Sequence, residues 1–184
     1  QGVAPFEISE KGLVPAIKEI GKRFERKEIF LPHLILSAEA MERGLALIEK
    51  TMKSGRKQRA SKGSIILATV EGDIHEIGKN IVAMMLKNHG FEVIDLGKSV
   101  PASRIDAEAK KIKPDIIGLS ALMTTTVIKM PETIKLMKRR KIPVMVGGAV
   151  VTKEYAKKIG ADLYAKDAMT AVRGAEKILP KKKS

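Results

Sequence analysis

Beyond Gly63, short apolar segments alternate with longer amphipathic ones, and this alternation limits the possible folds more than any other feature of the sequence. The short segments are rich in β-branched residues and bounded by Gly, Pro or Asp, as strands are; they are 65–70, 91–96, 115–119, 144–146 and 162–165. Helices are expected at about 79–88, 103–112, 126–140, 153–159 and 168–179. Continuous apolar strands joined by crossover helices form parallel sheets covered on both faces. The sequence therefore predicts a five-stranded, doubly wound α/β domain of the flavodoxin-like or Rossmann-like type.

The first part of the chain has a purely helical pattern. A run without acidic residues at 53–62 separates the two parts, so we predict a helical module over 1–60 and the α/β domain over 61–184. Ser9 suits the N-cap of a first helix, whose apolar face consists of Leu13, Ile17, Ile20 and Phe24. A second helix is expected from Leu31-Pro32, because proline is tolerated in a first turn. Two amphipathic helices cannot bury both apolar faces alone, so this module must pack against another surface.

The formal net charge of +14 raises the question of a nucleic-acid partner. Three runs without acidic residues, at 53–62, 135–141 and 181–183, contain 13 basic residues, nearly the whole excess. Binding of single-stranded nucleic acid would require aromatic residues among these cations, and the three runs contain none. The charge therefore favours solubility or attraction of partner proteins, and nucleic-acid binding is the disfavoured alternative.

Two absences concern the compartment. The sequence contains no Cys, which excludes a disulfide framework and cysteine chemistry. No apolar run approaches the ~20 residues needed to cross a bilayer, and the first residues do not resemble a signal peptide. We expect a cytoplasmic protein that does not bind membranes.

The loops that follow the strands hold the candidate chemistry, because ligands of open α/β sheets bind beyond the carboxyl ends of the strands. Asp73 and His75 lie two residues apart in the first loop, before Gly78. A carboxylate that accepts the imidazole N–H fixes its tautomer and leaves the other ring nitrogen free for proton transfer or metal ligation.

The third and fourth strands are followed by further candidates. Ser120 ends the third strand, where its hydroxyl would reach the first loop if the two strands are neighbours, or would cap a helix. Gly147 and Gly148 follow the fourth strand and allow either close approach of a ligand or a turn.

Taken together, Asp73-x-His75-x-x-Gly78, Ser120-x-Leu122 and Gly147-Gly148 resemble the cobalamin-binding signature of corrinoid proteins, over most of 60–180. The resemblance implies that His75 is the lower axial ligand of cobalt, with the cofactor's own base displaced, that Asp73 is its partner, and that Ser120 completes a hydrogen-bonded relay. It also implies a set of cofactor-binding residues, namely Gly72, Asp73, Ile74, His75, Glu76, Ile77, Gly78, Ser120, Leu122, Thr124, Gly147, Gly148, Ala149, Tyr164 and Asp167.

The helical part carries a second resemblance. Phe30-Leu31-Pro32, Ser37-Ala38 and Met41 are similar to the cap module of cobalamin-dependent methionine synthase and of small methyl-carrying corrinoid proteins. That cap normally has four helices, whereas about two are expected here, so we expect a truncated cap. Phe30, Leu31 and Met41 are candidate cap contacts, although a core role is favoured for each.

These resemblances imply a methyl carrier that binds cobalamin, such as methylcobalamin, through its cobalt. Such a carrier is not a complete enzyme. A substrate-specific methyltransferase would methylate the cobalt, an acceptor methyltransferase would remove the methyl group, and a reductive activator is a further expected partner. The alternatives are a small subunit of an adenosylcobalamin-dependent mutase, a cobalamin-dependent regulator, and the nucleic-acid-binding domain. The methyl donor and acceptor, the lower base of the natural corrinoid and the oligomeric state stay open.

Overall fold

The computed structural model describes residues 5–53 and 61–179, and the chain forms two compact units, Gln1–Gln58 and Arg59–Ser184. Most of the basic run at 53–62, and all of the run at 181–183, lie outside the described residues. The third run, 135–141, forms the end of a helix, as predicted.

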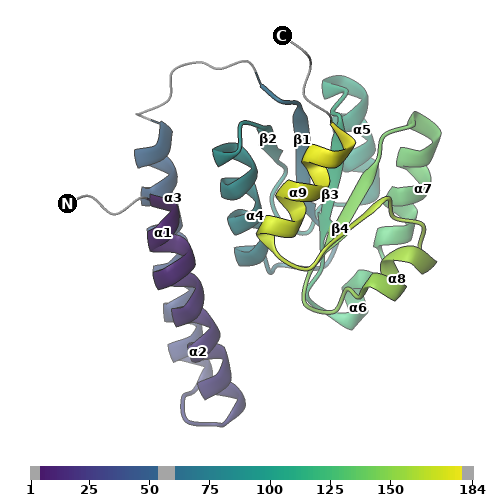
Figure 1. Ribbon diagram of the computed structural model, residues 1–184. Helices are drawn as coiled ribbons and strands as arrows, with labels where there is room; N and C mark the ends of the chain where they lie inside the picture. Colours follow the sequence, from purple (N-terminus) through teal and green to yellow (C-terminus); the bar gives the residue numbers. More distant parts are fainter. Residues whose placement is uncertain (1–4, 54–60, 180–184) are drawn as a thin grey trace. The chain divides into compact units, whose positions relative to one another are not determined.

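The first unit is a pair of helical segments joined by a short turn (Figure 1). Its first segment is continuous through α1 (Pro5–Ile8), the π-helical stretch η1 (Ser9–Leu13) and α2 (Val14–Glu25), and the second is α3 (Leu31–Lys53). The helix thus begins before Ser9, and the expectation that Ser9 caps it was wrong. The Ser9 side chain is buried, and its hydroxyl has no hydrogen-bond partner among the described residues.

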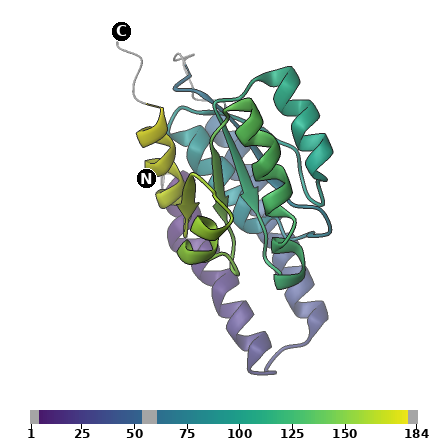
Figure 2. The same cartoon turned by 90° about the vertical axis from the view of Figure 1, so that its right-hand side faces the viewer.

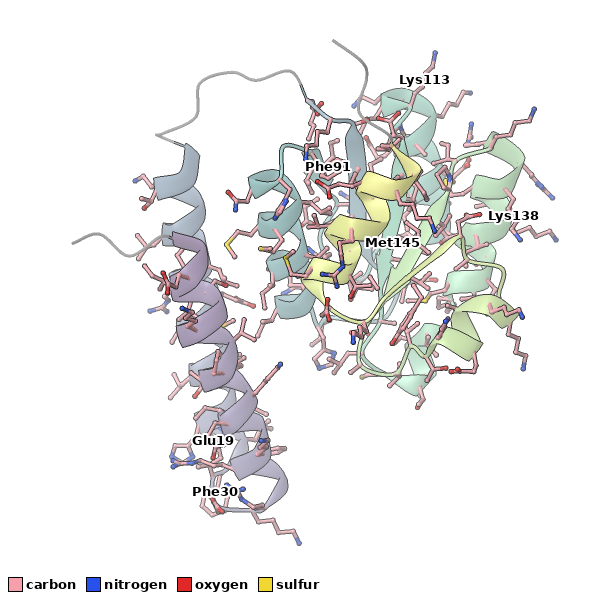
Figure 3. The ribbon with its side chains drawn as sticks, in the orientation of Figure 1. Glu19, Phe30, Phe91, Lys113, Lys138 and Met145 are labelled. Atoms are coloured by element: carbon pink, nitrogen blue, oxygen red, sulfur yellow. The ribbon has the colours of Figure 1, made fainter. Side chains whose placement is uncertain are left out.

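The two segments of this unit bury only part of their apolar surface. Met41, Leu45 and Ile48 of α3 are buried. A larger set of apolar side chains stays exposed: Ile8, Phe24, Phe30, Leu31, Ile35, Leu36 and Leu47. Phe30 lies in the turn at the end of the pair (Figure 3) and is 70% exposed, so the core role expected for Phe30 and Leu31 was wrong, whereas that expected for Met41 is confirmed.

The second unit contains the predicted five-stranded parallel sheet. The strands are β1 (Ser64–Thr69), β2 (Glu92–Asp95), β3 (Ile116–Ser120), β4 (Val144–Gly147) and β5 (Leu163–Ala165). Their order is β2-β1-β3-β4-β5, with every pair parallel. This is the flavodoxin-like order, so the predicted fold class is confirmed, and β1 and β3 are neighbours.

Helices cover both faces of the sheet. They are α4 (Ile77–Asn88), α5 (Ala102–Ile112), α6 (Thr124–Val127), α7 (Met130–Arg140), α8 (Lys153–Lys158) and α9 (Ala168–Ile178). Figures 1 and 2 show α4 and α9 on one face and α5 and α7 on the other, in agreement with the contacts within each pair. Because both faces are covered, Ile65, Ile66, Ile116 and Ile117 have no exposed surface. Met145 lies within this core (Figure 3).

The single helix expected over 126–140 is two helices, α6 and α7. Pro131 has no N–H to donate to the carbonyl of Val127, four residues earlier. The Tyr155 hydroxyl donates to that carbonyl instead, at 3.1 Å. Pro131 of α7 and Tyr155 of α8 therefore end α6 close to the carboxyl edge of the sheet.

Candidate functional site

The loop between β1 and α4 presents an oriented imidazole. The Asp73 side chain is completely buried, and its Oδ1 accepts hydrogen bonds from the backbone N–H of His75 (3.0 Å) and from His75 Nδ1 (2.8 Å). The His75 side chain is 44% exposed. Because an ionised carboxylate only accepts, Nδ1 carries a proton, and in the neutral ring the lone pair then lies on Nε2. Nε2 is thereby available as a ligand.

The other oxygen of Asp73 is held from β3's side of the site. Oδ2 accepts hydrogen bonds from Leu122 N (2.8 Å), Met123 N (3.3 Å) and Thr126 Oγ1 (2.6 Å). Burial alone would raise the pKa of Asp73, but the hydrogen bonds from Thr126, Leu122 and His75 outweigh it and hold the pKa well below its usual range. The carboxylate is therefore charged, which strengthens its hold on the Nδ1 proton and makes Nε2 a better electron donor.

Thr126 takes the place next to Asp73 that the sequence suggested for Ser120. Ser120 ends β3 opposite Thr69, but its hydroxyl makes no hydrogen bond within the part of the chain that the structure describes. The role of Ser120 in a relay stays a prediction. Thr126 was missed as a site residue, although the cluster Thr124 to Thr126 marked the start of a helix facing this edge.

The segment 70–76 between β1 and α4 is called the histidine loop below. The loop that follows β2 holds it from the other side. Gly72 donates its N–H to Ser99 Oγ (3.1 Å), and Ser99 donates its own N–H to Asp73 O (2.9 Å). Gly72 has φ +80°, a conformation that favours glycine. Ser99 was not among the predicted site residues, because contacts between loops 27 residues apart leave no mark in the local sequence.

Exposed apolar side chains come from the loops that carry the Asp73 contacts. Ile74 is 65% exposed, and Leu122 and Met123 follow Ser120 with 44% and 38% exposed. Among residues 5–53 and 61–179 no group of three or more His, Cys, Asp or Glu is placed to hold a metal ion. A metal bound by His75 would therefore bring its other ligands with it. One free imidazole nitrogen beside exposed apolar side chains fits a metal held in a large, partly apolar ring.

The packing of the chain itself explains the two glycines at the end of β4, where Gly147 is the last strand residue and Gly148 follows it. A Cβ at Gly147 would lie 2.8 Å from Ala165 O, and one at Gly148, where φ is +127°, would lie 1.9 Å from Ala121 O. The space that side chains would occupy is thus taken by the backbone of neighbouring segments. Of the two alternatives left by the sequence, the structure shows the close passage of the chain itself, and contact with a ligand at these glycines stays a prediction.

The remaining predicted residues lie in or near the segments that follow the strands. Ile77 and Gly78 open α4, Thr124 opens α6 and is exposed, Ala149 is exposed, and Tyr164 is half-buried in β5. Asp167 is the N-cap of α9, where its Oδ1 accepts from Thr170 N and Oγ1, both at 2.7 Å. The hydrogen bonds from Thr170 lower the pKa of Asp167. Glu76 is half-buried between two lysines, described below.

Comparison with known proteins agrees with this geometry. Residues 63–173 match the family model of the B12 binding domain, and residues 1–49 match a second model with the same description. The chain is 46% identical over 175 residues to trimethylamine corrinoid protein 1 of Methanosarcina mazei, covering 93% of this chain and 81% of the relative. It is 47% identical over 179 residues to the dimethylamine corrinoid protein of Methanosarcina barkeri, covering 95% and 84%.

Solved structures give the same result. The monomethylamine corrinoid protein of Methanosarcina barkeri matches with a TM-score of 0.84 and 33% identity, over 96% of this chain and 85% of that one. The methanol:cobalamin methyltransferase complex MtaBC of the same organism matches with a TM-score of 0.63 and 31% identity, over 97% and 69%.

The fold and the site thus define a cobalamin-binding α/β protein. The chain belongs to the family of corrinoid proteins that carry a B12-binding domain. The predicted cofactor class is confirmed at this level, whereas the assignment of individual cofactor-binding residues stays a prediction. None of the helices in the described part of the chain combines the length and the apolar composition that a membrane span requires.

Proposed function

We propose that this protein carries a methyl group between two methyltransferases on the cobalt of a corrinoid held by His75. The observation that carries the proposal is the free Nε2 of a half-exposed imidazole, whose Nδ1 is held by a buried carboxylate that accepts five hydrogen bonds. When bound, the corrinoid supplies a cobalt atom that accepts and releases the methyl group.

The residues of the chain would control the ligand rather than the methyl group itself. His75 donates the Nε2 lone pair, and Asp73 keeps the proton on Nδ1. Nε2 would be the ring atom that can take up a proton when no metal is bound to it, with the Asp73 carboxylate held beside Nδ1. The exposed side chains of Ile74, Leu122 and Met123 would be covered by the corrin ring, which favours binding by about 25 cal/mol for each Å² of apolar surface removed from water.

The partners follow from the relatives. MtaBC is a methyltransferase complex. The relatives with about 45% identity to this chain are named trimethylamine or dimethylamine corrinoid proteins. We infer that a methyltransferase specific for a methylated amine loads this protein, that a second one unloads it, and that a reductive activator restores the nucleophilic state. The relatives named above are corrinoid proteins of methyltransferase systems, so the mutase and nucleic-acid-binding alternatives are not favoured.

Ligation by His75 is tested with protein labelled with ¹⁵N only in histidine and reconstituted with cobalamin. In the paramagnetic Co(II) state, the hyperfine splitting should be that of ¹⁵N, because the cofactor's own base contains ¹⁴N. His75→Ala should lose the ¹⁵N splitting, and the control His89→Ala, which changes the C-cap of α4, should keep it. A ¹⁴N splitting in the unaltered protein would refute the proposal.

The methylated-amine assignment is tested separately. The Co(I) form is mixed with a trimethylamine- or a dimethylamine-specific methyltransferase and the corresponding amine, and methylation is followed by absorption. Methylation by one of the two is expected. Failure of both, with the ¹⁵N result intact, would remove the amine assignment and leave the carrier role.

A further inference from the structure

A buried ammonium lies next to the histidine loop and has no part in the ligation described above. Lys79, in the first turn of α4, has only 2% of its side chain exposed. Lysine is almost never buried to this degree unless it is paired. Its Nζ contacts the carboxylate of Asp95, Asn80 Oδ1 at 2.8 Å and Glu76 Oε2 at 3.4 Å. Two of these three partners are charged.

The Asp95 carboxylate holds this ammonium at the end of β2. Asp95 is the last residue of β2, and its Oδ1 accepts the N–H of Gly97 at 2.8 Å. Removing an ion pair from water offsets much of its attraction, so such a pair contributes less to stability than apolar side chains of similar size. Fold stability alone therefore does not explain a buried lysine here. Its contact with Glu76, next to His75 in the chain, points to a further role.

Glu76 is the residue that follows His75, and two lysines hold it. Lys79 lies at Oε2, and Lys98, which is 54% exposed, lies 3.6 Å from Oε1. On the other side of His75, the Asp73 carboxylate is buried with its five hydrogen bonds. Between these two anchors remain only Ile74 and His75, both exposed.

We propose that Lys79 is a positioning residue for the cobalt ligand: by fixing Glu76 to the end of β2, it limits the distance over which His75 can move when the ring binds and leaves the metal. This inference rests on the proposed function, because it takes His75 as the ligand. Residues outside the first coordination shell that orient a histidine typically change metal affinity by about 10- to 100-fold. Lys79 acts through one more residue, so we expect the lower end of that range.

The first test replaces Lys79 by a neutral side chain of similar length. In Lys79→Met reconstituted with cobalamin, the ratio of protein with His75 bound to cobalt (His-on) to protein with His75 unbound (His-off) should fall by about tenfold. The ¹⁵N splitting of the Co(II) state measures this ratio. Without cofactor, amide hydrogen exchange of residues 74–77 should become faster. Glu76→Gln should reproduce both effects, since it leaves the pair of Lys79 and Asp95 in place.

A second variant separates positioning from folding. Lys79→Met leaves the Asp95 charge without its lysine and lowers the unfolding temperature for that reason. Lys79→Met with Asp95→Asn removes both charges, so the unfolding temperature should recover while ligation by His75 stays weak. Recovery of ligation together with stability would overturn the proposal and leave Lys79 a purely structural role.

Arg140→Met is the matched control. Arg140 forms a bidentate ion pair with Asp106, at 2.6 and 2.8 Å, between α7 and α5. Its loss should lower the unfolding temperature without changing the ¹⁵N splitting. An unchanged His-on ratio in Lys79→Met, with a normal ¹⁵N signal in the unaltered protein, would refute this inference alone. Absence of that signal from the unaltered protein would refute the proposed function and this inference with it.

Discussion

The two units of this protein differ in how completely they bury their apolar side chains. In the α/β unit the central strands are enclosed by helices on both faces, and Ile65, Ile66, Ile116 and Ile117 have no exposed surface. In the helical unit, Phe30, Leu36 and Leu47 are 70%, 63% and 67% exposed. A closed core supports a precise site, whereas an exposed apolar surface is suited to covering another one. The candidate ligand accordingly lies on the closed unit.

The largest contrast is expected from shortening one apolar side chain in each unit. Ile117→Ala removes three buried methyl or methylene groups from the middle of the sheet and should lower the free energy of unfolding by about 4 kcal/mol. Leu36→Ala, at a surface position of α3, should change it by less than about 0.5 kcal/mol. Urea denaturation followed by circular dichroism measures both. A loss in Leu36→Ala equal to that in Ile117→Ala would mean that α3 is buried in solution.

A glycine in each unit gives the next contrast. Gly148→Ala places a Cβ against Ala121 O at a φ of +127° and should lower the free energy of unfolding by about 3 kcal/mol. Gly44→Ala meets only the flexible end of Leu13, at 3.1 Å, and alanine favours the helix by about 1 kcal/mol, so little net change is expected. The same denaturation experiment applies. An unaltered stability in Gly148→Ala would show that the loop after β4 shifts easily.

The buried carboxylate makes the stability of the α/β unit depend on pH. Without cofactor, Asp73→Asn should lower the free energy of unfolding by about 2 kcal/mol near pH 7, because an amide cannot accept all five hydrogen bonds. The pKa of Asp73 is lowered in the folded protein, so its contribution is complete above the usual value near 3.8 and decreases as the pH falls below it. Denaturation at several pH values should therefore show the two proteins converging in acid. A constant difference down to pH 2 would contradict the lowered pKa.

The smallest expected effect distinguishes the two hydroxyl groups at the site. Thr126→Val keeps the shape of the side chain but removes the donor to Asp73, and should lower the free energy of unfolding by about 1 kcal/mol without cofactor. Ser120→Ala removes a hydroxyl that bonds to no described residue and should have no measurable effect on the cofactor-free protein. If Ser120→Ala proves the more harmful of the two, the relay implied by the family resemblance forms through Ser120.

Local sequence patterns were sufficient to predict the strands, the sheet type and the pair of Asp73 and His75. Apolar alternation with crossover helices specifies a parallel sheet, and a spacing of two residues lets a carboxylate reach the imidazole without help from distant residues. The same local patterns failed at Ser9, where the helix began earlier than its cap signal, and at 126–140. In the second case Pro131 was visible in the sequence, but Tyr155, which satisfies the freed carbonyl of Val127, was not recognisable as its partner.

Only the tertiary structure decided what surrounds the candidate ligand. Leu122 and Thr126 reach Asp73 across 49 and 53 residues, and Asp95 meets Lys79 across 16. These contacts depend on β1 lying between β2 and β3, which is a property of the whole sheet. The sequence by itself determined that Asp73 can hold one ring nitrogen of His75 and leave the other free, and the structure identified the free atom as Nε2. The order of the strands determined which distant side chains hold it in place, because hydrogen bonds form between neighbours in space whatever their separation along the chain.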